Sequence, residues 1–438
     1  MSDDLDDDAN PLQPVKGVRD TYPEDMRVRR WLFAQWRDIA ESFGYEEYDA
    51  CVLEHEALYT RKAGDEITGQ LYNFQDKGGR RVALRPELTP SLARMVMARG
   101  ATLPLPARWF AIPQCFRYEQ MQKGRKREHY QWNMDCIGLA DAAAEAELMA
   151  AQVAFLRRTG LTLDGAQPDI VLKVSHRQVL GGVLEEMGIS GERFAAICVI
   201  IDKRGKVPDE ALAGMMAAHG VGAADATRIL DLIGTEGLDA IAAKVPAGNP
   251  GLIELRRLLE LARASGFEHL IRLDLSVIRG LSYYTGTVWE VFANRGGIRR
   301  AVAGGGRYDR LCAMLGGSSV PMVGFGFGDV VITEILRELG LLPPTPRRLD
   351  SVVYPMSQAE FATANRIAAH LRGQGQRVLV DYSCRRFKHV VQRAEGDGAR
   401  ELVILGGNEV AAGIAKVRTL GGAERQERDV PLAGLGAG

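Results

Sequence analysis

The length and the charge of the chain set the first limits on what it can be. Its 438 residues exceed what one hydrophobic core usually supports, so two or three domains are expected. Apolar residues make up 46% and charged residues 25%, which is ordinary for a soluble globular protein. Because 55 Lys and Arg residues nearly balance 56 Asp and Glu residues, any surface that binds nucleic acid must be local.

The sequence shows no sign of export or of a membrane span. It contains no run of about 18 apolar residues, and the acidic start MSDDLDDDAN lacks the apolar core of a signal peptide. Residues 1–14 are expected to form a disordered acidic tail. The six cysteines are scattered, without a Cys-x-x-Cys pair or a histidine at metal-ligand spacing, which favours reduced cysteines in a cytoplasmic protein and predicts no protein-bound metal.

The first hundred residues predict one long helix and several short strands. Residues 23–43 begin with proline and carry a stripe of large apolar side chains, which is typical of an amphipathic helix. Gly44 ends this helix, and a strand is expected over 45–53. The segments YNFQD and RRVALRPE, joined by KGG, predict a hairpin. Thr89 is expected to cap a helix whose first position is Pro90.

Strand patterns lie on both sides of a helical block in the middle of the chain. RWFAIPQCFRYE and HYQWNMDCIGLA predict two strands around a polar loop, followed by a helix at 142–158. Residues from about 177 to 267 have mostly helical patterns, so they are interpreted as an insertion in a sheet domain. HLIRLDLSVI and TGTVWEVF predict the returning strands, and a glycine-rich segment and a helix near 330–339 follow.

The last ninety residues predict a second domain. LGLLPPTPRRL is rich in proline and basic, which indicates a linker at 341–349. Beyond it the strand patterns SVVYPM, QRVLVDY, ELVILGG and IAKVRTL alternate with two helical patterns. This alternation is typical of a small α/β domain, here expected at 350–438.

The segment FRYEQMQKGRKREHYQWNMD concentrates polar side chains on the two predicted strands. Alternate side chains share a face of a strand, so Arg117 lies with Glu119, and Gln131 and Asn133 lie with Asp135. The pair of strands would thus bring an arginine, two carboxylates and an amide onto one surface.

The loop between these strands is strongly basic. It holds Lys123, Arg125, Lys126 and Arg127 around Gly124. A charge run on a loop is usually only solvated surface. The polar strand faces beside it also require an explanation, which favours a binding role.

Three other segments carry polar side chains at unusual places. In LRPELTP, a capping role explains Thr89 but does not explain Glu87 beside proline. In LSVIRGLSYYTGTVWEVF, Gly280 after Arg279 marks a bulge or a close backbone approach, although the paired tyrosines that follow are more often packing residues. The glycines at 304–306 are compatible with a simple tight turn.

The segment VGFGFGD places three glycines on one face of a predicted strand. Gly324, Gly326 and Gly328 share that face, and phenylalanines occupy the other. A strand face without side chains admits a flat ligand against the backbone. The spacing does not match a dinucleotide-binding or phosphate-binding glycine loop.

In this order the segments resemble the class II aminoacyl-tRNA synthetases, and specifically the histidyl-tRNA synthetase family. FRYE…GRKRE…Q…D is similar to motif 2 of the class, LSVIRGLSYYTGTVWEVF and AGGGRYDRL to two peptides peculiar to the family, and VKGVRDTYPEDM to its N-terminal signature. The resemblance covers nearly the whole chain after Pro14. It implies an α+β fold, with an antiparallel-sheet catalytic domain at 15–340, interrupted by a helical insertion, and a C-terminal α/β anticodon-binding domain.

The resemblance implies a reaction and its residues. Histidine would be activated with ATP, as its Mg²⁺ complex, and transferred to the 3′ end of tRNA(His). The residues implied to bind histidine are Glu87 and Thr89 at its amino group, Gln131 and Arg279 at its carboxylate, and Asp135, Tyr283, Tyr284 and Tyr308 at its imidazole. Those implied to bind ATP are Arg117, Glu119, Arg125, Arg127 and either His129 or Tyr130. The residues implied to act in catalysis are Arg117, Gln131 and Arg279, and those implied to receive the tRNA acceptor end are Gln122, Lys123 and Lys126.

Some positions depart from the family pattern. The departures are Cys51 for the proline of motif 1, Leu88 for a glycine, Ser282 for an aspartate, and Val331 for the motif 3 arginine that serves ATP. Another cation would have to replace that arginine, and Arg307 and Arg310 are the candidates.

Two other functions are compatible with parts of the sequence. A non-catalytic, histidine-sensing regulatory paralogue of ATP phosphoribosyltransferase is favoured by the missing motif 3 arginine, whereas the retained motif 2 residues and the complete C-terminal domain argue against it. A plain nucleic-acid-binding protein leaves the catalytic motifs unexplained. A homodimer is expected, because the aromatic side chains of residues 23–43 exceed what one helix face can hide and because the family dimerises through motif 1. These side chains are Trp31, Phe33, Trp36 and Phe43.

Overall fold

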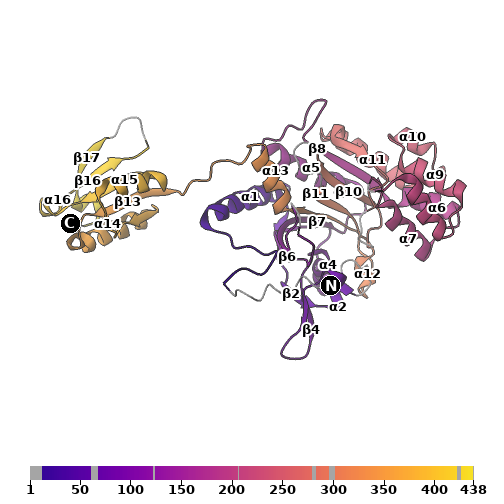
Figure 1. Cartoon of the computed structure of the whole chain (residues 1–438), viewed down its shortest axis with the longest axis horizontal. Coiled ribbons are helices and arrows are strands. Elements are labelled where there is room, and N and C mark those ends of the chain that lie inside the picture. Colours follow the sequence, from indigo (N-terminus) through magenta and orange to yellow (C-terminus); the bar gives the residue numbers. More distant parts are fainter. Residues whose placement is uncertain are drawn as a thin grey trace. The chain divides into compact units, whose positions relative to one another are not determined.

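The computed structural model describes residues 12–60, 68–121, 124–205, 207–278, 283–294, 301–421 and 426–437. The chain divides into two compact units. One contains the residues up to 22 and residues 28–342, and the other contains residues 23–27 and 343–438. Each unit has its own sheet and its own hydrophobic core, so each is described by itself (Figure 1).

The first unit is built on a nine-stranded sheet. Its strands, in spatial order, are β1 (Glu46–Glu47), β5 (Ala107–Ala111), β7 (Glu128–Ile137), β12 (Met322–Gly328), β11 (Ala301–Arg307), β10 (Thr287–Ala293), β8 (Ile170–His176) and β9 (Ile271–Leu273), and β6 (Gln114–Phe116) pairs with the start of β7. All neighbours from β5 to β8 are antiparallel, and only the edge pairs β1–β5 and β8–β9 are parallel. The predicted antiparallel sheet is confirmed. The glycines at 304–306 lie inside β11, so the interpretation as a tight turn is wrong.

Aromatic side chains pack helices α1 (Pro23–Ser42) and α5 (Ala143–Arg158) on one face of this sheet. Trp36 of α1 stacks on Trp132 of β7, with ring centroids 6.0 Å apart. Phe155 of α5 meets both Trp132 and Phe327 of β12 edge-on. These rings are fully buried and form the centre of the main core, since large aromatic side chains bury the most apolar area per residue.

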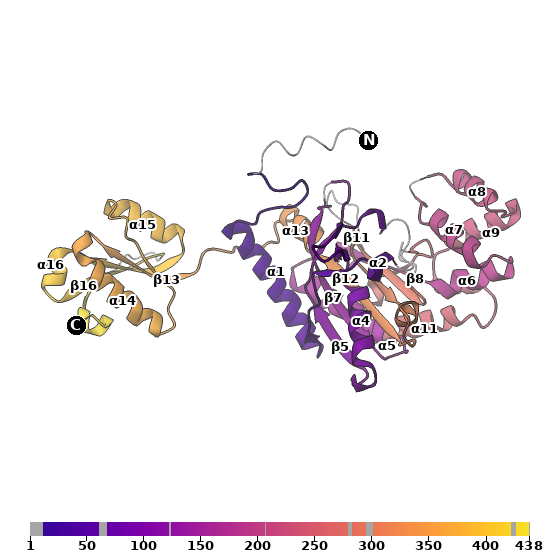
Figure 2. The ribbon, with the colours of Figure 1, turned by 90° about the horizontal axis from the view of Figure 1, so that it is seen from below.

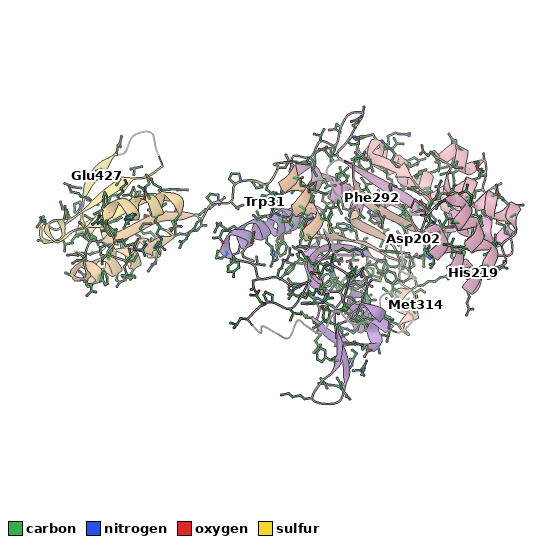
Figure 3. All side chains as sticks on the ribbon, viewed as in Figure 1. Trp31, Asp202, His219, Phe292, Met314 and Glu427 are labelled. Atoms are coloured by element: carbon green, nitrogen blue, oxygen red, sulfur yellow. The ribbon has the colours of Figure 1, made fainter. Side chains whose placement is uncertain are left out.

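The aromatic stripe of α1 is therefore largely covered within one chain. Trp36 is buried, and Trp31, Phe33 and Phe43 pack, partly buried, against the same core. Trp31 is labelled on α1 in Figure 3. The expectation that a monomer cannot hide these side chains is wrong, because the sheet supplies a wide apolar surface that one helix considered alone does not have.

Two short helices cover part of the opposite face of the sheet. They are α4 (Thr89–Arg99) and α12 (Leu311–Met314), which pack around the second core of this unit. Thr89 is the first residue of α4, and Leu88 precedes it without a side-chain cap. The prediction that Thr89 caps the helix is wrong. Its hydroxyl is thereby left for contacts outside the helix.

The predicted hairpin forms a small separate sheet. Its strands, in order, are β2 (Leu53–His55), β4 (Arg81–Leu84) and β3 (Asn73–Gln75), and both pairings are antiparallel. Helix α2 (Ala57–Thr60) follows β2. In Figure 1 the β4 hairpin extends away from the large sheet.

Among the described residues, six α-helices lie between β8 and β9, where the helical block is predicted. They are α6 (Arg177–Glu186), α7 (Gly191–Ile201), α8 (Asp209–Ala218), α9 (Ala223–Ile233), α10 (Leu238–Ala242) and α11 (Pro250–Ala264). Figure 2 shows α6 to α9 as a cluster beside the β8 side of the sheet, and Figure 3 labels Asp202 and His219 within it. At the entry to this block the buried His176 bonds Glu254 of α11 through Nε2 at 2.8 Å.

The second unit is an α/β domain, as predicted, and its sheet has five strands where the sequence predicted four. Its strands, in spatial order, are β14 (Val378–Val380), β13 (Leu349–Pro355), β15 (Ala399–Leu405), β16 (Ile414–Thr419) and β17 (Glu427–Pro431). The first three are parallel, and the longer helices α14 (Phe361–Gly373) and α15 (Phe387–Gly396) connect them. Strand β17 was not predicted, because it is a mostly exposed edge strand with the polar sequence ERDVP. None of the helices in the described part of the chain combines the length and hydropathy that crossing a bilayer requires.

Candidate active site

The polar face of β7 is the floor of the site. Gln131 and Asp135 face β12 on the side that α4 and α12 partly cover, and Trp132 and Met134 point into the core on the other side. The alternation predicted for this strand is confirmed. It arises because successive side chains of a strand point to opposite faces.

The glycines of β12 make room for this polar row. Gly324 pairs with Asp135, and a Cβ atom placed on Gly324 would lie 1.9 Å from Asp135 Oδ1. A Cβ atom on Gly326 would lie 3.3 Å from Gln131 Oε1. The bare strand face predicted from the sequence therefore accommodates side chains of the protein itself, in addition to any ligand.

Asp135 is a buried carboxylate held by a tyrosine. The Tyr308 hydroxyl donates a hydrogen bond to Asp135 Oδ1. Burial raises the pKa of Asp135 to about 7, and the bond from Tyr308 partly opposes that rise. Burial and the neighbouring Asp135 charge raise the pKa of Tyr308 well above its ordinary value, so the phenol stays protonated. This pair can accept a hydrogen bond from a ligand and discriminate between ligands.

Glu87 is a second buried carboxylate, and a cluster of tyrosines connects it to Asp135. The Tyr283 hydroxyl donates to Glu87 Oε2 at 2.8 Å, and a hydrogen bond with Thr89 acts on the same hydroxyl. The Tyr283 ring lies 5.1 Å from that of Tyr284 and 5.9 Å from that of Tyr308. The structure thus brings together all the described residues implied at the amino group and the imidazole of histidine.

Arg117 and Glu119 lie beyond the end of a strand. Strand β6 ends at Phe116, so the prediction that both residues share a strand face is wrong. They are nevertheless close, because the chain turns and Glu119 N donates to Arg117 O at 2.8 Å. Glu119 carboxylate oxygens lie 3.9 Å from Arg117 Nη1 and 3.2 Å from Arg125 Nε. Arg117 Nε also donates to Pro86 O at 2.9 Å, which fixes the guanidinium beside the Glu87 turn.

Arg127 is held differently from the rest of the basic loop. Its guanidinium carbon lies 3.8 Å above the centre of the Tyr118 ring, and Nη1 donates to Lys16 O at 3.3 Å. A Cβ atom on Gly17, where φ is +90°, would lie 2.6 Å from Arg127 Cδ. Arg127 therefore anchors the N-terminal segment on the site. By contrast, Lys126 is exposed.

His129 and Tyr130 lie on opposite faces of β7. Tyr130 packs on Phe33 of α1, under the guanidinium of Arg29. His129 shares the face of Gln131, and burial together with the charges of Arg117 and Arg19 lowers its pKa to about 3. Of the two candidates for a contact with adenine, His129 is the one on the polar face, as a neutral imidazole.

The site lacks the arginine that the resemblance places at position 331. Val331 lies in helix α13 (Asp329–Glu338) and is buried in the main core. Arg307 cannot replace that arginine, because its guanidinium is buried and bonds both carboxylate oxygens of Glu145 at 2.6 and 2.7 Å. That interpretation is wrong. The second candidate, Arg310, is exposed at the start of α12.

Some of the predicted residues lie outside the described residues, and others were missed. Those outside are Gln122, Lys123, Arg279 and Ser282.

Sequence reasoning missed Tyr48, whose hydroxyl is buried without a hydrogen-bond partner in the described part of the chain. Burial and the Asp135 charge raise its pKa well above the ordinary value. Arg19 and Asp329 were also missed. Only Arg19 could have been found from the sequence, because it lies in the VKGVRD segment that resembles the family's N-terminal signature.

The comparisons with known proteins agree with this geometry. The model of the histidyl-tRNA synthetase family matches residues 17–328, and that of an anticodon binding domain matches residues 350–435. The chain is 43% identical to a relative named histidine–tRNA ligase, chloroplastic/mitochondrial, from Arabidopsis thaliana, over 94% of this chain and 84% of that protein. It is 38% identical to a histidine–tRNA ligase from Opitutus terrae, over 96% of each chain.

Solved structures share the fold. A histidyl-tRNA synthetase from Nostoc sp. PCC 7120 has a TM-score of 0.77 and 23% identity, over 97% of this chain and 98% of that one. A Bacillus halodurans protein described as an ATP phosphoribosyltransferase regulatory subunit/histidyl-tRNA synthetase has a TM-score of 0.72 and 21% identity, over 90% of this chain and 98% of that one. At these identities the likeness concerns the fold alone. The family model over residues 17–328, together with the relatives that are 43% and 38% identical, carries the assignment, and the chain belongs to the histidyl-tRNA synthetase family.

Proposed function

We propose that this chain is a histidine–tRNA ligase, which activates histidine with ATP and transfers it to the 3′ end of tRNA(His). The observation that carries the proposal is the buried Asp135–Tyr308 pair beside the Glu87–Tyr283 pair, within a domain that matches the family model. The second unit matches an anticodon-binding domain, which supports tRNA as the acceptor.

The two buried carboxylates suit the two nitrogen-bearing ends of histidine. Asp135 can accept a hydrogen bond from an imidazole N–H, and Glu87 can attract the α-ammonium group. Both carboxylates are already oriented by tyrosine hydroxyls, so little reorganisation is needed when the ligand binds. An amino acid without the imidazole N–H would leave the buried acceptor positions of Asp135 that Tyr308 does not fill without a donor, which disfavours that amino acid.

The reaction is a displacement at phosphorus, so positioning and charge stabilisation carry it. We propose that the histidine carboxylate, held by Gln131 and Arg279, attacks the α-phosphate of ATP, with Arg117 at that phosphate. Glu119, Arg125 and Arg127 belong to the proposed ATP set, and Mg²⁺ accompanies ATP as part of the substrate.

The tRNA would approach the same face. Gln122, Lys123 and Lys126 lie in the basic loop that follows Arg117, and lysines beside a reactive centre attract the phosphates of an acceptor end. Phosphate contacts of this kind position a nucleic acid, whereas base contacts specify it.

We also propose a cytoplasmic homodimer. The support comes from the small sheet, where Leu53 and Phe74 are each more than 40% exposed, as is Val52 directly before β2. Apolar side chains gathered on one exposed sheet indicate an interaction surface. Sedimentation at micromolar concentration tests it, and a monomer would contradict the proposal.

Pyrophosphate exchange tests the function. With histidine, ATP and labelled pyrophosphate, we expect label to enter ATP only when histidine is present, and we expect tRNA(His) to be charged in a second assay. A regulatory paralogue would bind histidine and give no exchange. That result would overturn the proposed function.

A further inference from the structure

ATP brings several negative charges to a site in which most arginines are already engaged. Arg125 lies against Glu119, Arg127 stacks on Tyr118, and Arg307 is locked by Glu145. Position 331, at the start of α13, carries an apolar valine. Because Arg125 and Arg127 of the proposed ATP set already have contacts within the protein, another cation beside Arg117 would improve the neutralisation of the triphosphate.

Arg19 is placed to be that cation. It belongs to the N-terminal segment that Arg127 anchors, and its Nη2 donates to Asp329 Oδ2 at 2.6 Å. Asp329 is the first residue of α13 and also accepts from Tyr130 N at 2.9 Å. The Arg19 guanidinium therefore sits at the beginning of α13, two residues before Val331.

Two features of Arg19 indicate a role beyond this ion pair. Its Nε is buried without a hydrogen-bond partner in the described part of the chain, although the side chain as a whole is 30% exposed. Buried donors are nearly always paired in folded proteins, so such a donor points to a missing acceptor.

The second feature is the charge around His129. Arg19 and Arg117 both lower the pKa of this imidazole, so both guanidinium groups lie close to the same ring. Each guanidinium lies beside a carboxylate, Arg19 beside Asp329 and Arg117 beside Glu119, and a phosphate bound near the ring would interact favourably with both guanidinium groups.

We infer that Arg19 binds the triphosphate of ATP and supplies, from the N-terminal segment, the cation that α13 lacks at position 331. The inference rests on the proposed function. Asp329 then acts as a positioning residue, which aims the guanidinium through one of its nitrogens and leaves the others for phosphate oxygens. Arginine suits this task, because its planar group can bind a carboxylate and a phosphate at the same time.

The test compares Arg19→Gln and Arg19→Lys with the wild-type chain in histidine-dependent pyrophosphate exchange. We expect Arg19→Gln to lower kcat/KM for ATP by about 10²-fold, with KM for histidine within about twofold of wild type. Arg19→Lys should recover part of the loss. The matched control is Arg30→Gln, a loss of one exposed arginine on α1, which should change neither constant.

Asp329→Asn separates binding from a purely structural ion pair. If Arg19 only holds the N-terminal segment on α13, Arg19→Gln and Asp329→Asn will lower Tm equally and affect ATP and histidine in step, which would overturn the inference. If Arg19 binds ATP, Arg19→Gln will raise KM for ATP much more than Asp329→Asn does. Absence of exchange in the wild-type chain would instead count against the proposed function itself.

Discussion

Asp135 should make the first unit less stable as the pH rises toward neutrality, and this change in the free energy of unfolding can be measured. The carboxylate is buried, and its pKa is raised to about 7. The folded protein therefore binds a proton at Asp135 between about pH 4 and pH 7, where the unfolded chain has already lost it. Its contribution to stability is complete below the unfolded pKa and is lost as the pH rises through about 7.

The variant Asp135→Asn removes this titration and keeps the shape of the side chain. Its amide oxygen can still accept the hydrogen bond from Tyr308. The rise in pKa from the ordinary value of 3.8 to about 7 corresponds to about 4 kcal/mol as an upper limit at pH 8. Relative to wild type, we expect Asp135→Asn to be neutral near pH 4 and increasingly stabilised from pH 5 to pH 8.

Thermal or denaturant unfolding at pH 5, 6.5 and 8, followed by the fluorescence of the buried tryptophans, measures this difference. Asp239→Asn is the matched control, because that side chain is 96% exposed and its replacement should change the stability little. In the same variant KM for histidine should rise far more than KM for ATP. A stability difference that is flat with pH would refute the reasoning about the buried charge, and equal effects on the two KM values would show that Asp135 is only structural.

Three further predictions concern the same site. Gly324→Ala should raise KM for histidine and lower Tm, because the added Cβ would displace the Asp135 carboxylate. The control is Gly214→Ala in α8, where an added Cβ has no neighbouring atom within 4 Å, and this variant should keep both values near wild type. Tyr48→Phe should raise the Tm of the unliganded protein, since it removes a buried hydroxyl that has no partner among the described residues; a lower Tm would show that the hydroxyl is bonded. Arg279→Ala should reduce pyrophosphate exchange on the order of 10²–10³-fold and should reduce transfer from preformed histidyl-adenylate much less. Arg279→Lys should recover part of the exchange activity. A parallel loss of both steps, together with a loss of thermal stability, would contradict a catalytic role.

Patterns with a short period in the sequence determine much of the fold. The alternation from Gln131 to Asp135, the hairpin of β3 and β4 and the strand–helix order of the second unit each follow from neighbouring residues. Side-chain direction in a strand repeats every two residues, and turn residues act within a few positions, so such features are written locally in the chain. The residues proposed to bind histidine were identified from motifs of the same kind.

Only the tertiary structure decided which partner each charged side chain has. Arg307 meets Glu145, 162 residues away, and Arg19 meets Asp329, 310 residues away. The neighbouring residues in the sequence do not distinguish an arginine that can bind phosphate from one whose guanidinium is paired inside the core. The difference lies in the burial and the partner that folding gives each guanidinium, because a buried charge needs a specific counter-charge and an exposed charge does not.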